Sequence, residues 1–262
     1  MKFANQRNFL RNETELYSPN LATINSVPEL VSFADKLALE RGVDLKTDTA
    51  AYVQLCSELV EKRFRFGTAT YEISDNWIAF FMGKLFWHHF EAIVDPNDIL
   101  KHSEGLCSQQ TIVFLNLLKN KGISFRTVGL GFKEGPGHFL SEVKYTNSWN
   151  LYDVSIEPKW AAIYSKNRSL EFYLKNKDLL YLVYEGKISK ESFALLLRKV
   201  EYGKPNTLPA KNMLLFHHLT HSLTFIFPVL LSWLFFLSIS KSRRKKKIEA
   251  LKVTPLTKIN SF

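Results

Sequence analysis

The chain has 262 residues, 46% of them hydrophobic, which is long enough for one domain of ordinary size and an appendage. Its net charge is +10, but from Lys241 onward eight Lys and Arg stand against Glu249 alone, and the rest of the chain is nearly balanced. A nucleic-acid-binding domain carries its charge on its own surface, so we expect no nucleic-acid partner. The two cysteines, Cys56 and Cys107, exclude a disulfide-rich scaffold.

The first part of the chain predicts a helical region behind a polar start. Residues 1–25 are polar, and no apolar run follows the first lysine, so the sequence shows no signal peptide. Apolar residues at helical spacing predict three helices, over 26–40, 48–64 and about 74–86. Ser26 is placed to cap the first helix, and Asp48 or Thr49 the second. Cys56 falls on the apolar stripe of the second helix, so we expect it to be a core residue.

His88, His89 and Glu91 form a cluster of potential metal ligands. Adjacent histidines on a helix point about 100° apart, and no HExxH pattern is present, so packing or surface roles are favoured. We therefore expect neither a metal nor a cofactor.

The stretch from Gly105 to Asp153 contains the residues that point to chemistry. Cys107 follows a glycine-containing turn and opens an apolar run, predicted as a helix over 108–120 that Gly122 ends in a left-handed conformation. Alternating apolar residues then predict three strands, at about 128–132, 139–145 and 149–156, with a turn at 135–137.

Cys107, His138 and Asp153 supply a thiol, an imidazole and a carboxylate in chain order. In nucleophilic thiol chemistry the thiolate attacks, the imidazole carries the proton, and the carboxylate fixes the imidazole tautomer. A cysteine at a helix start lies near the positive end of the backbone dipole, which favours thiolate, and near N–H groups that can receive an oxyanion. A lone cysteine or a lone strand histidine is more often structural, so the hypothesis rests on the three together.

The relative orientation of His138 and Asp153 depends on the hairpin between them. A turn at 146–148 places the two side chains on opposite faces of the strands. A one-residue bulge, or a tighter turn at 145–146, returns them to one face, because a slip of one residue reverses every side chain. The catalytic hypothesis requires one of these alternatives.

In this order the motifs resemble the core of the transglutaminase-like family, within the papain-like cysteine protease superfamily. The shared features, over roughly 80–160, are a glycine and Cys107 at a helix start, Gly122-Ile123 at its end, Arg126 on a strand, His138 with Glu142-Val143, and Trp149 followed by Asp153. The resemblance implies an α+β fold with a helical N-terminal part and a nucleophile helix packed on an antiparallel sheet. It also implies that Cys107 is the nucleophile, His138 the general base and acid, and Asp153 the orienting carboxylate.

The chain departs from the family pattern beside two of these residues. Ser108 and the two glutamines after it follow the cysteine, where the family often has an acidic or small residue, and Phe139 replaces a frequent tryptophan. These departures affect the identity of the substrate more than the chemistry. A second oxyanion donor beside the Cys107 N–H is expected upstream or next to the cysteine, and the candidates are Asn76, Trp77 and Gln109.

The last part of the chain predicts two further helices, a linker and a membrane segment. The helices are expected over 169–184 and 189–200, which closes a transglutaminase-like domain at 26–201, and residues 202–212 form the linker. Residues 213–240 are apolar, and at 1.5 Å per residue this run exceeds the ~30 Å hydrocarbon core of a bilayer. We therefore expect one transmembrane helix in contact with the lipid bilayer, with Pro228 tolerated inside it.

The basic tail, residues 241–262, predicts an orientation. Lys and Arg clusters stay on the cytoplasmic side, so we expect a cytoplasmic tail and a domain on the external or periplasmic side. The missing leader favours the alternative, a cytoplasmic domain whose tail binds anionic lipid.

These features predict a membrane-anchored cysteine enzyme that forms an acyl-enzyme at Cys107. Its substrate would be a peptide, a protein or another amide or ester, and it would act as a peptidase or amidase or by acyl transfer. The alternative is a catalytically silent binding or assembly module of the same fold at the membrane. A membrane scaffold that recruits a partner through its basic tail is a third hypothesis.

Overall fold

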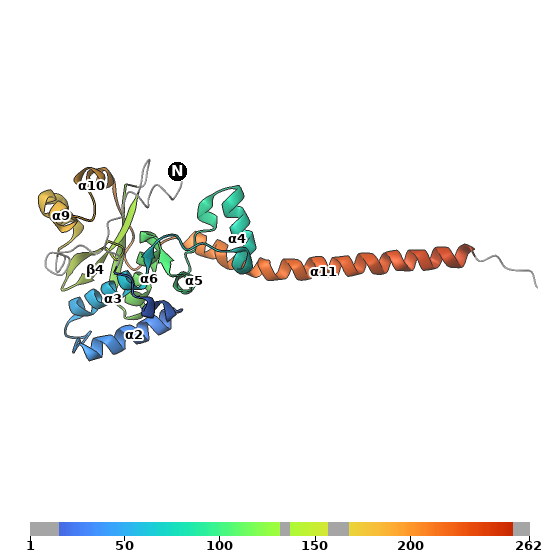
Figure 1. Cartoon of the computed structure of the whole chain (residues 1–262), viewed down its shortest axis with the longest axis horizontal. Coiled ribbons are helices and arrows are strands. Elements are labelled where there is room, and N and C mark those ends of the chain that lie inside the picture. Colours follow the sequence, from blue (N-terminus) through green and yellow to red (C-terminus); the bar gives the residue numbers. More distant parts are fainter. Residues whose placement is uncertain (1–15, 132–136, 157–167, 254–262) are drawn as a thin grey trace, which may run out of the picture.

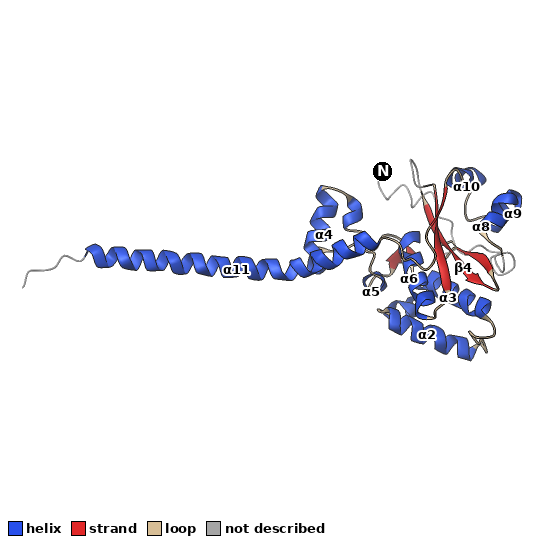
Figure 2. Cartoon of the chain, turned by 180° about the vertical axis from the view of Figure 1, so that it is seen from behind, coloured by secondary structure: helices blue, strands red, loops and turns tan. Residues whose placement is uncertain are grey.

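The computed structural model describes residues 16–131, 137–156 and 168–253, and it contains a mixed domain of helices and sheet from which one long helix extends (Figure 1). A four-stranded sheet, in the order β5-β4-β3-β6, lies between two groups of helices. Figure 2 shows the sheet between α2 and α3 on one side and α8 to α10 on the other. Most of the polar start, part of the expected turn at 135–137 and the end of the basic tail lie outside the described residues.

The helical N-terminal part begins with a 3-10 turn, η1 (Pro19–Thr23), and two helices, α2 (Val27–Glu40) and α3 (Thr49–Arg63). The expected caps are confirmed, since Ser26 Oγ accepts the Glu29 N–H and Asp48 accepts the Ala51 N–H. Arg63 ends α3 in complete burial, where its guanidinium donates to backbone carbonyls of two distant segments, residues 22–24 and 100–102. A buried cation needs such donors satisfied, so Arg63 joins the N-terminal part to the segment that precedes Cys107.

The segment between α3 and the cysteine contains short elements. A two-residue strand, β1 (Arg65–Phe66), pairs in parallel with β2 (Glu104–Gly105), directly before the cysteine. Between them lie α4 (Ile73–Leu85), η2 (His88–Phe90) and α5 (Pro96–Leu100). α4 and η2 form a tight hairpin, because Gly83 approaches Glu91 so closely that a Cβ there would lie 2.6 Å from the Glu91 Cβ.

The helix that begins at Cys107 and the sheet follow. α6 runs over Cys107–Asn120 and begins one residue earlier than predicted, while Gly122 takes the expected left-handed φ of 67°. β3 (Ser124–Leu130), β4 (His138–Tyr145) and β5 (Ser148–Tyr152) pair antiparallel, and β3 begins before its predicted start.

The hairpin between β4 and β5 settles the side on which His138 and Asp153 lie. Its turn consists of two residues, Thr146 and Asn147, both with positive φ, and Tyr145 pairs with Ser148 without a bulge. This turn is neither of the two expected alternatives, but it gives the same parity as a turn at 145–146. His138 and Asp153 therefore share one face of the β4–β5 pair.

The part after the sheet differs from the sequence expectation in two places. The helix expected over 169–184 is broken at Asn176 into α8 (Leu170–Lys175) and α9 (Lys177–Val183). The helix expected over 189–200 is shorter, α10 (Lys190–Leu196), and a strand follows, β6 (Val200–Tyr202), which adds to the free edge of β3. The expected linker therefore begins inside a strand.

Two apolar cores lie on the two faces of the sheet. One contains buried residues of α2, α3 and α6 together with sheet residues such as Phe125, Val143 and Tyr152. The other contains residues of α8, α9 and α10 together with Val128, Leu140 and Leu151. Alternate residues of each strand enter different cores, so the sheet is buried on both faces.

The chain then enters α11 (Lys211–Val253), the long helix in Figure 1. Within it, Lys211–Lys246 is long and apolar enough to cross a membrane, and 6% of its most apolar window is buried. Pro228 lies inside the helix, as expected for this segment.

Candidate functional site

Cys107 is the first residue of α6, and the residue is 7% exposed. The first intrahelical bond runs from the Gln110 N–H to the Leu106 carbonyl. The N–H groups of Cys107 and Ser108 precede that bond, at positions where a helix offers no acceptor. The cysteine sulfur therefore lies at the positive end of a 14-residue helix, beside backbone donors.

His138 opens β4 and is bonded to Asp153, which directly follows β5. His138 Nε2 lies 2.5 Å from Asp153 Oδ2, and both side chains are buried. The second ring nitrogen, Nδ1, is also buried and has no hydrogen-bond partner among the described residues. The Cys107 thiol lies close enough to this imidazole to contribute to the rise in its pKa.

Electrostatic attraction between His138 and Asp153 shifts the pKa values of both side chains. Burial alone lowers the pKa of His138, but the Asp153 carboxylate outweighs burial and, with a smaller contribution from Cys107, raises that pKa to about 10. Burial would raise the pKa of Asp153, yet His138 and hydrogen bonds from Tyr184 and Ser155 hold it below its ordinary value. At neutral pH the pair is an imidazolium and a carboxylate.

Asp153 is fixed by donors on both of its oxygens. Oδ1 accepts hydrogen bonds from the Ser155 hydroxyl at 3.1 Å and from the Ser155 and Ile156 N–H groups. Oδ2 accepts from the Tyr184 hydroxyl at 3.0 Å as well as facing His138. Tyr184 directly follows α9 and is a site residue that the sequence analysis did not identify, because nothing in the local pattern links it to a carboxylate 31 positions away.

The other residues of the resemblance hold the sheet together. Arg126 donates to Glu142 through Nε at 2.7 Å and stacks over the rings of Trp149 and Tyr202, at 4.5 and 4.3 Å. Glu142 is fully buried, and its second oxygen accepts the Leu170 N–H at 2.7 Å. This network joins all four strands of the sheet to the start of α8.

The candidate oxyanion side chains have other partners. Trp77 donates its indole N–H to the Thr224 carbonyl of α11 at 3.3 Å, and Asn76 hydrogen-bonds the Thr220 hydroxyl of the same helix. Gln109 donates to the carbonyls of Ala69 and Ile93 and accepts from the N–H groups of Ala69 and Leu106. Its carboxamide thus fastens the loop in front of α6 and keeps Cys107 at the helix start.

A groove of about 720 Å³ lies beside the cysteine. Its lining is mainly apolar and comes from the start of α6, from residues 87–94, from Phe139 and from residues 209–213 at the start of α11. Cys107, Ser108 and Leu106 form the part nearest the helix N-terminus. A molecule in this groove would meet the thiol and the N–H groups at the start of α6 together.

The second cysteine differs from Cys107 in its surroundings. Cys56 lies fully buried in α3, and this burial raises the pKa of its thiol to about 12. The expectation that Cys56 is a core residue is confirmed.

The His88–His89 cluster shows packing contacts. His89 lies against the ring of Trp87 at 4.5 Å, and Glu91 is paired with Lys84 at 2.8 Å. Within the described ranges, no group of three His, Cys, Asp or Glu side chains is arranged to hold a metal ion.

Comparison with known proteins found no matching family model, no matching curated protein and no matching solved structure.

Proposed function

We propose that the protein is a membrane-anchored cysteine enzyme that forms an acyl-enzyme at Cys107 on an amide or ester substrate. The observation that supports this most directly is the buried pair of His138 and Asp153, which leaves one imidazole nitrogen for the thiol at the start of α6. A buried imidazolium beside a thiol stabilises the thiolate, which is the nucleophilic form. The likeness of the motif order to the transglutaminase-like family supports the same assignment.

The reaction proceeds in two halves. The Cys107 thiolate attacks the carbonyl carbon, a C–S bond forms, and the oxyanion is received by the N–H groups at the start of α6. The His138 imidazolium then gives its proton to the leaving amine or alcohol as the C–N or C–O bond breaks. In the second half water, or an acceptor amine, attacks the thioester, gives a proton to His138 and releases the acyl group as the C–S bond breaks.

The groove indicates the kind of acyl group. Its walls are apolar beside Cys107, with Phe139, Ile112 and Met213 among the lining residues. An aliphatic or aromatic acyl group gains about 25 cal/mol for each Å² of apolar surface that it buries there. We therefore expect longer apolar acyl groups to react faster than acetyl groups, with hydrolysis as the ordinary outcome.

The test is to trap the acyl group on the full chain reconstituted in lipid nanodiscs. The chain is mixed with p-nitrophenyl esters and anilides of acetate and octanoate, quenched in acid and analysed by peptide mass spectrometry. We expect one acyl adduct, on Cys107, and a loss of roughly 100-fold or more in its rate of formation in His138→Ala. Cys56 is the internal control, because its buried thiol with a raised pKa stays unmodified.

The same experiment separates the proposal from its alternative. His138 is buried and Cys107 is only slightly exposed. If this burial keeps substrates away from the thiol, the domain is a catalytically silent binding module. Absence of an adduct on Cys107 with all four substrates would overturn the acyl-enzyme proposal in favour of the silent module.

The membrane arrangement belongs to the proposal as well. We place α11 across the bilayer with the basic tail on the cytoplasmic side and the domain on the opposite side, because Lys and Arg cluster from Lys241 onward. The tail would lie near anionic lipid headgroups. Cysteines introduced at Leu39 and at Ser242 and treated with a membrane-impermeant maleimide on intact cells test this, and labelling of Ser242 alone would reverse the orientation.

A further inference from the structure

The α4–η2 hairpin, residues 73–90 with the turn between them, exposes an unusual amount of apolar surface. Five large apolar side chains within fifteen residues are 45–73% exposed, namely Ile73, Phe81, Leu85, Phe86 and Trp87. Elsewhere in the described part of the domain such side chains are scattered, like Leu39 on α2 and Leu195 on α10. Single exposed apolar residues are normal, whereas a gathered set marks a surface that something covers.

This hairpin is joined to the start of α11 by buried polar contacts. Asn76 is fully buried and departs from helical φ and ψ inside α4. Its side-chain N–H donates to the Thr220 hydroxyl at 2.9 Å, and its side-chain oxygen Oδ1 accepts from the Thr224 hydroxyl at 3.3 Å. Trp77 donates to the Thr224 carbonyl and packs against the ring of Phe227. α4 is therefore fixed at the level of residues 220–227 of α11.

The sequence of α11 sets the depth of that level. Residues 212–240 contain no Asp, Glu, Lys or Arg, and at 1.5 Å per residue they extend about 43 Å. A span of about 20 residues, which crosses the hydrocarbon core, can be placed at several registers inside this segment. Residues 221–231 fall within the span in every placement. Thr224 and Phe227 therefore lie inside the span in every placement, and Trp77 beside them reaches the same depth.

The direction of α4 suits a helix that lies in the plane of the membrane. Figures 1 and 2 show α4 crossing α11 steeply, at the end of the domain from which the rest of α11 departs. A helix that crosses a membrane-spanning helix in this way runs along the bilayer surface. Lys84, the only basic residue of α4, is neutralised by the buried Glu91, and Trp77 and Trp87 belong to the residue type enriched at membrane interfaces.

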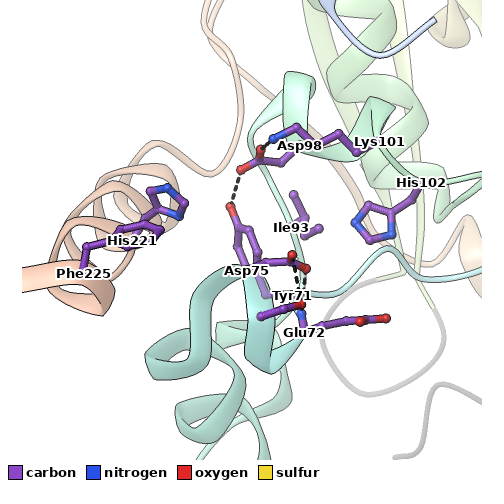
Figure 3. Close-up of a pocket in the computed structure, with 10 residues that line it drawn as sticks. Tyr71, Glu72, Asp75, Ile93, Asp98, Lys101, His102, His221 and Phe225 are labelled. Atoms are coloured by element: carbon purple, nitrogen blue, oxygen red, sulfur yellow. Dashed lines mark hydrogen bonds and ion pairs between the residues drawn. The ribbon is translucent and has the colours of Figure 1, made fainter. Parts of the chain in front are cut away.

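The opposite side of α4 is polar. A cavity of about 470 Å³ lies between the start of α4 and α11, and Figure 3 shows the Asp75 and Asp98 carboxylates and His221 around it. Tyr71 donates to Asp98 at 2.8 Å within this cavity. None of the five exposed apolar side chains lines it. The hairpin thus has a polar side toward this cavity, while four of its five exposed apolar side chains line neither cavity and Trp87 also lines the groove beside Cys107.

We propose that the α4–η2 hairpin is a second membrane-binding element, whose apolar side chains enter the bilayer interface beside α11 and fix the domain against the membrane surface. This inference rests on the part of the proposed function in which α11 crosses the bilayer, and it is independent of the chemistry at Cys107. The hairpin would also bring the groove beside Cys107 close to the bilayer. Residues between 87 and 94 and residues 209–213 line the groove, so its mouth lies beside the start of α11, on the membrane side of the domain. Its substrate is then a molecule held at the bilayer surface.

The test uses spin labels on the full chain in nanodiscs of phosphatidylcholine with phosphatidylglycerol. Single cysteines are introduced as Phe86→Cys on the hairpin, Leu39→Cys as the exposed apolar control and Leu231→Cys as the control inside α11, with Cys56 and Cys107 changed to alanine in all three. Collisions of the nitroxide with oxygen, which concentrates in hydrocarbon, are compared with collisions with a water-soluble nickel chelate. Each variant must retain the helical circular dichroism of the parent, and Leu85→Cys replaces Phe86→Cys if that variant misfolds.

We expect the ratio of oxygen to nickel accessibility at Phe86 to exceed that at Leu39 by roughly fivefold or more, and to approach that at Leu231. A ratio at Phe86 equal to that at Leu39, with Leu231 in lipid, would overturn the interfacial element while leaving the anchor intact. A label at Leu231 that behaves as if in water would overturn the anchor and this inference with it.

Discussion

Replacing Asp153 with asparagine removes the charge that holds His138 protonated while preserving the shape of the site. In the wild-type protein the pKa of His138 is raised to about 10 from an ordinary 6.5. At about 1.4 kcal/mol per pH unit this difference corresponds to roughly 5 kcal/mol, and removing one partner of a buried charge pair typically costs about 3–5 kcal/mol. In Asp153→Asn burial alone acts on the imidazole, so the pKa of His138 falls below its ordinary value and the ring is neutral at pH 7.

The loss depends on pH in a defined direction. Because the folded pKa of His138 is raised, its stabilisation is fully present below pH 6.5 and disappears as the pH rises through about 10. Because the folded pKa of Asp153 is lowered, its stabilisation is present above the ordinary carboxyl value and disappears as the pH falls through the folded pKa. Wild type and Asp153→Asn therefore differ most near pH 6 and least near pH 10.

Thermal unfolding of the full chain in a mild detergent, followed by near-ultraviolet circular dichroism, measures this difference. A loss of about 3 kcal/mol lowers the Tm of a domain of this size by roughly 6–12 °C at pH 6, and the gap closes to a few degrees at pH 10. Asp178→Asn, which changes an exposed carboxylate on α9, is the matched control with a shift of about 1 kcal/mol or less at either pH. A gap for Asp153→Asn that stays constant or grows from pH 6 to pH 10 would refute the imidazolium–carboxylate pair.

Two further substitutions separate positioning of the site from support of the sheet. Tyr184→Phe removes one donor to the Asp153 carboxylate, so we expect the free energy of unfolding to fall by about 1.5–3 kcal/mol. We also expect Cys107 acylation to slow less than it does in His138→Ala. An acylation rate as low as in His138→Ala would contradict this ranking. Glu142→Gln removes a buried carboxylate that accepts from Arg126 and from the Leu170 N–H, so we expect urea unfolding to show a loss of about 2–3 kcal/mol. Acylation of Cys107 by the folded protein should be preserved. A variant as stable as the wild type would contradict this prediction.

The local elements could be predicted because their signals lie within a few residues. Ser26 and Asp48 cap the first two long helices through bonds to N–H groups three positions on, and Gly122 takes the positive φ that ends α6. The apolar runs that follow these residues have the helical period, which is enough to fix type and approximate bounds. The order of thiol, imidazole and carboxylate could also be found in the sequence, since all three lie at element boundaries.

The register of the hairpin could not be fixed by the same reasoning. Thr146 and Asn147 form a two-residue turn with φ of 48° and 60°, a conformation that asparagine tolerates and threonine disfavours. The sequence signal for this turn was therefore half present, at Asn147. Tertiary pairing of Tyr145 with Ser148 and the burial of β4 and β5 on both faces override the reluctance of Thr146.

Contacts between distant segments lay beyond the sequence as well. β6 is three residues long and exists because β3 offers a free edge, so the run after α10 reads as a linker until the sheet is known. Tyr184 reaches Asp153 only because α9 packs on the same face of the sheet. Arg63 likewise finds its carbonyl acceptors in two segments about 40 positions away.

Asn76 shows how α11 and the site are built as one unit. A buried asparagine destabilises the fold unless its amide group is hydrogen-bonded. The amide of Asn76 bonds to Thr220 and Thr224 of α11, which share a helix face with the buried His217. His217 in turn bonds the Phe90 carbonyl, at the end of the hairpin whose residues lead into the groove beside Cys107. The first residues of α11 line that groove directly. α11 is therefore part of the wall of the site as well as the proposed anchor, because removing it would open the groove and leave Asn76 without its acceptors on that helix.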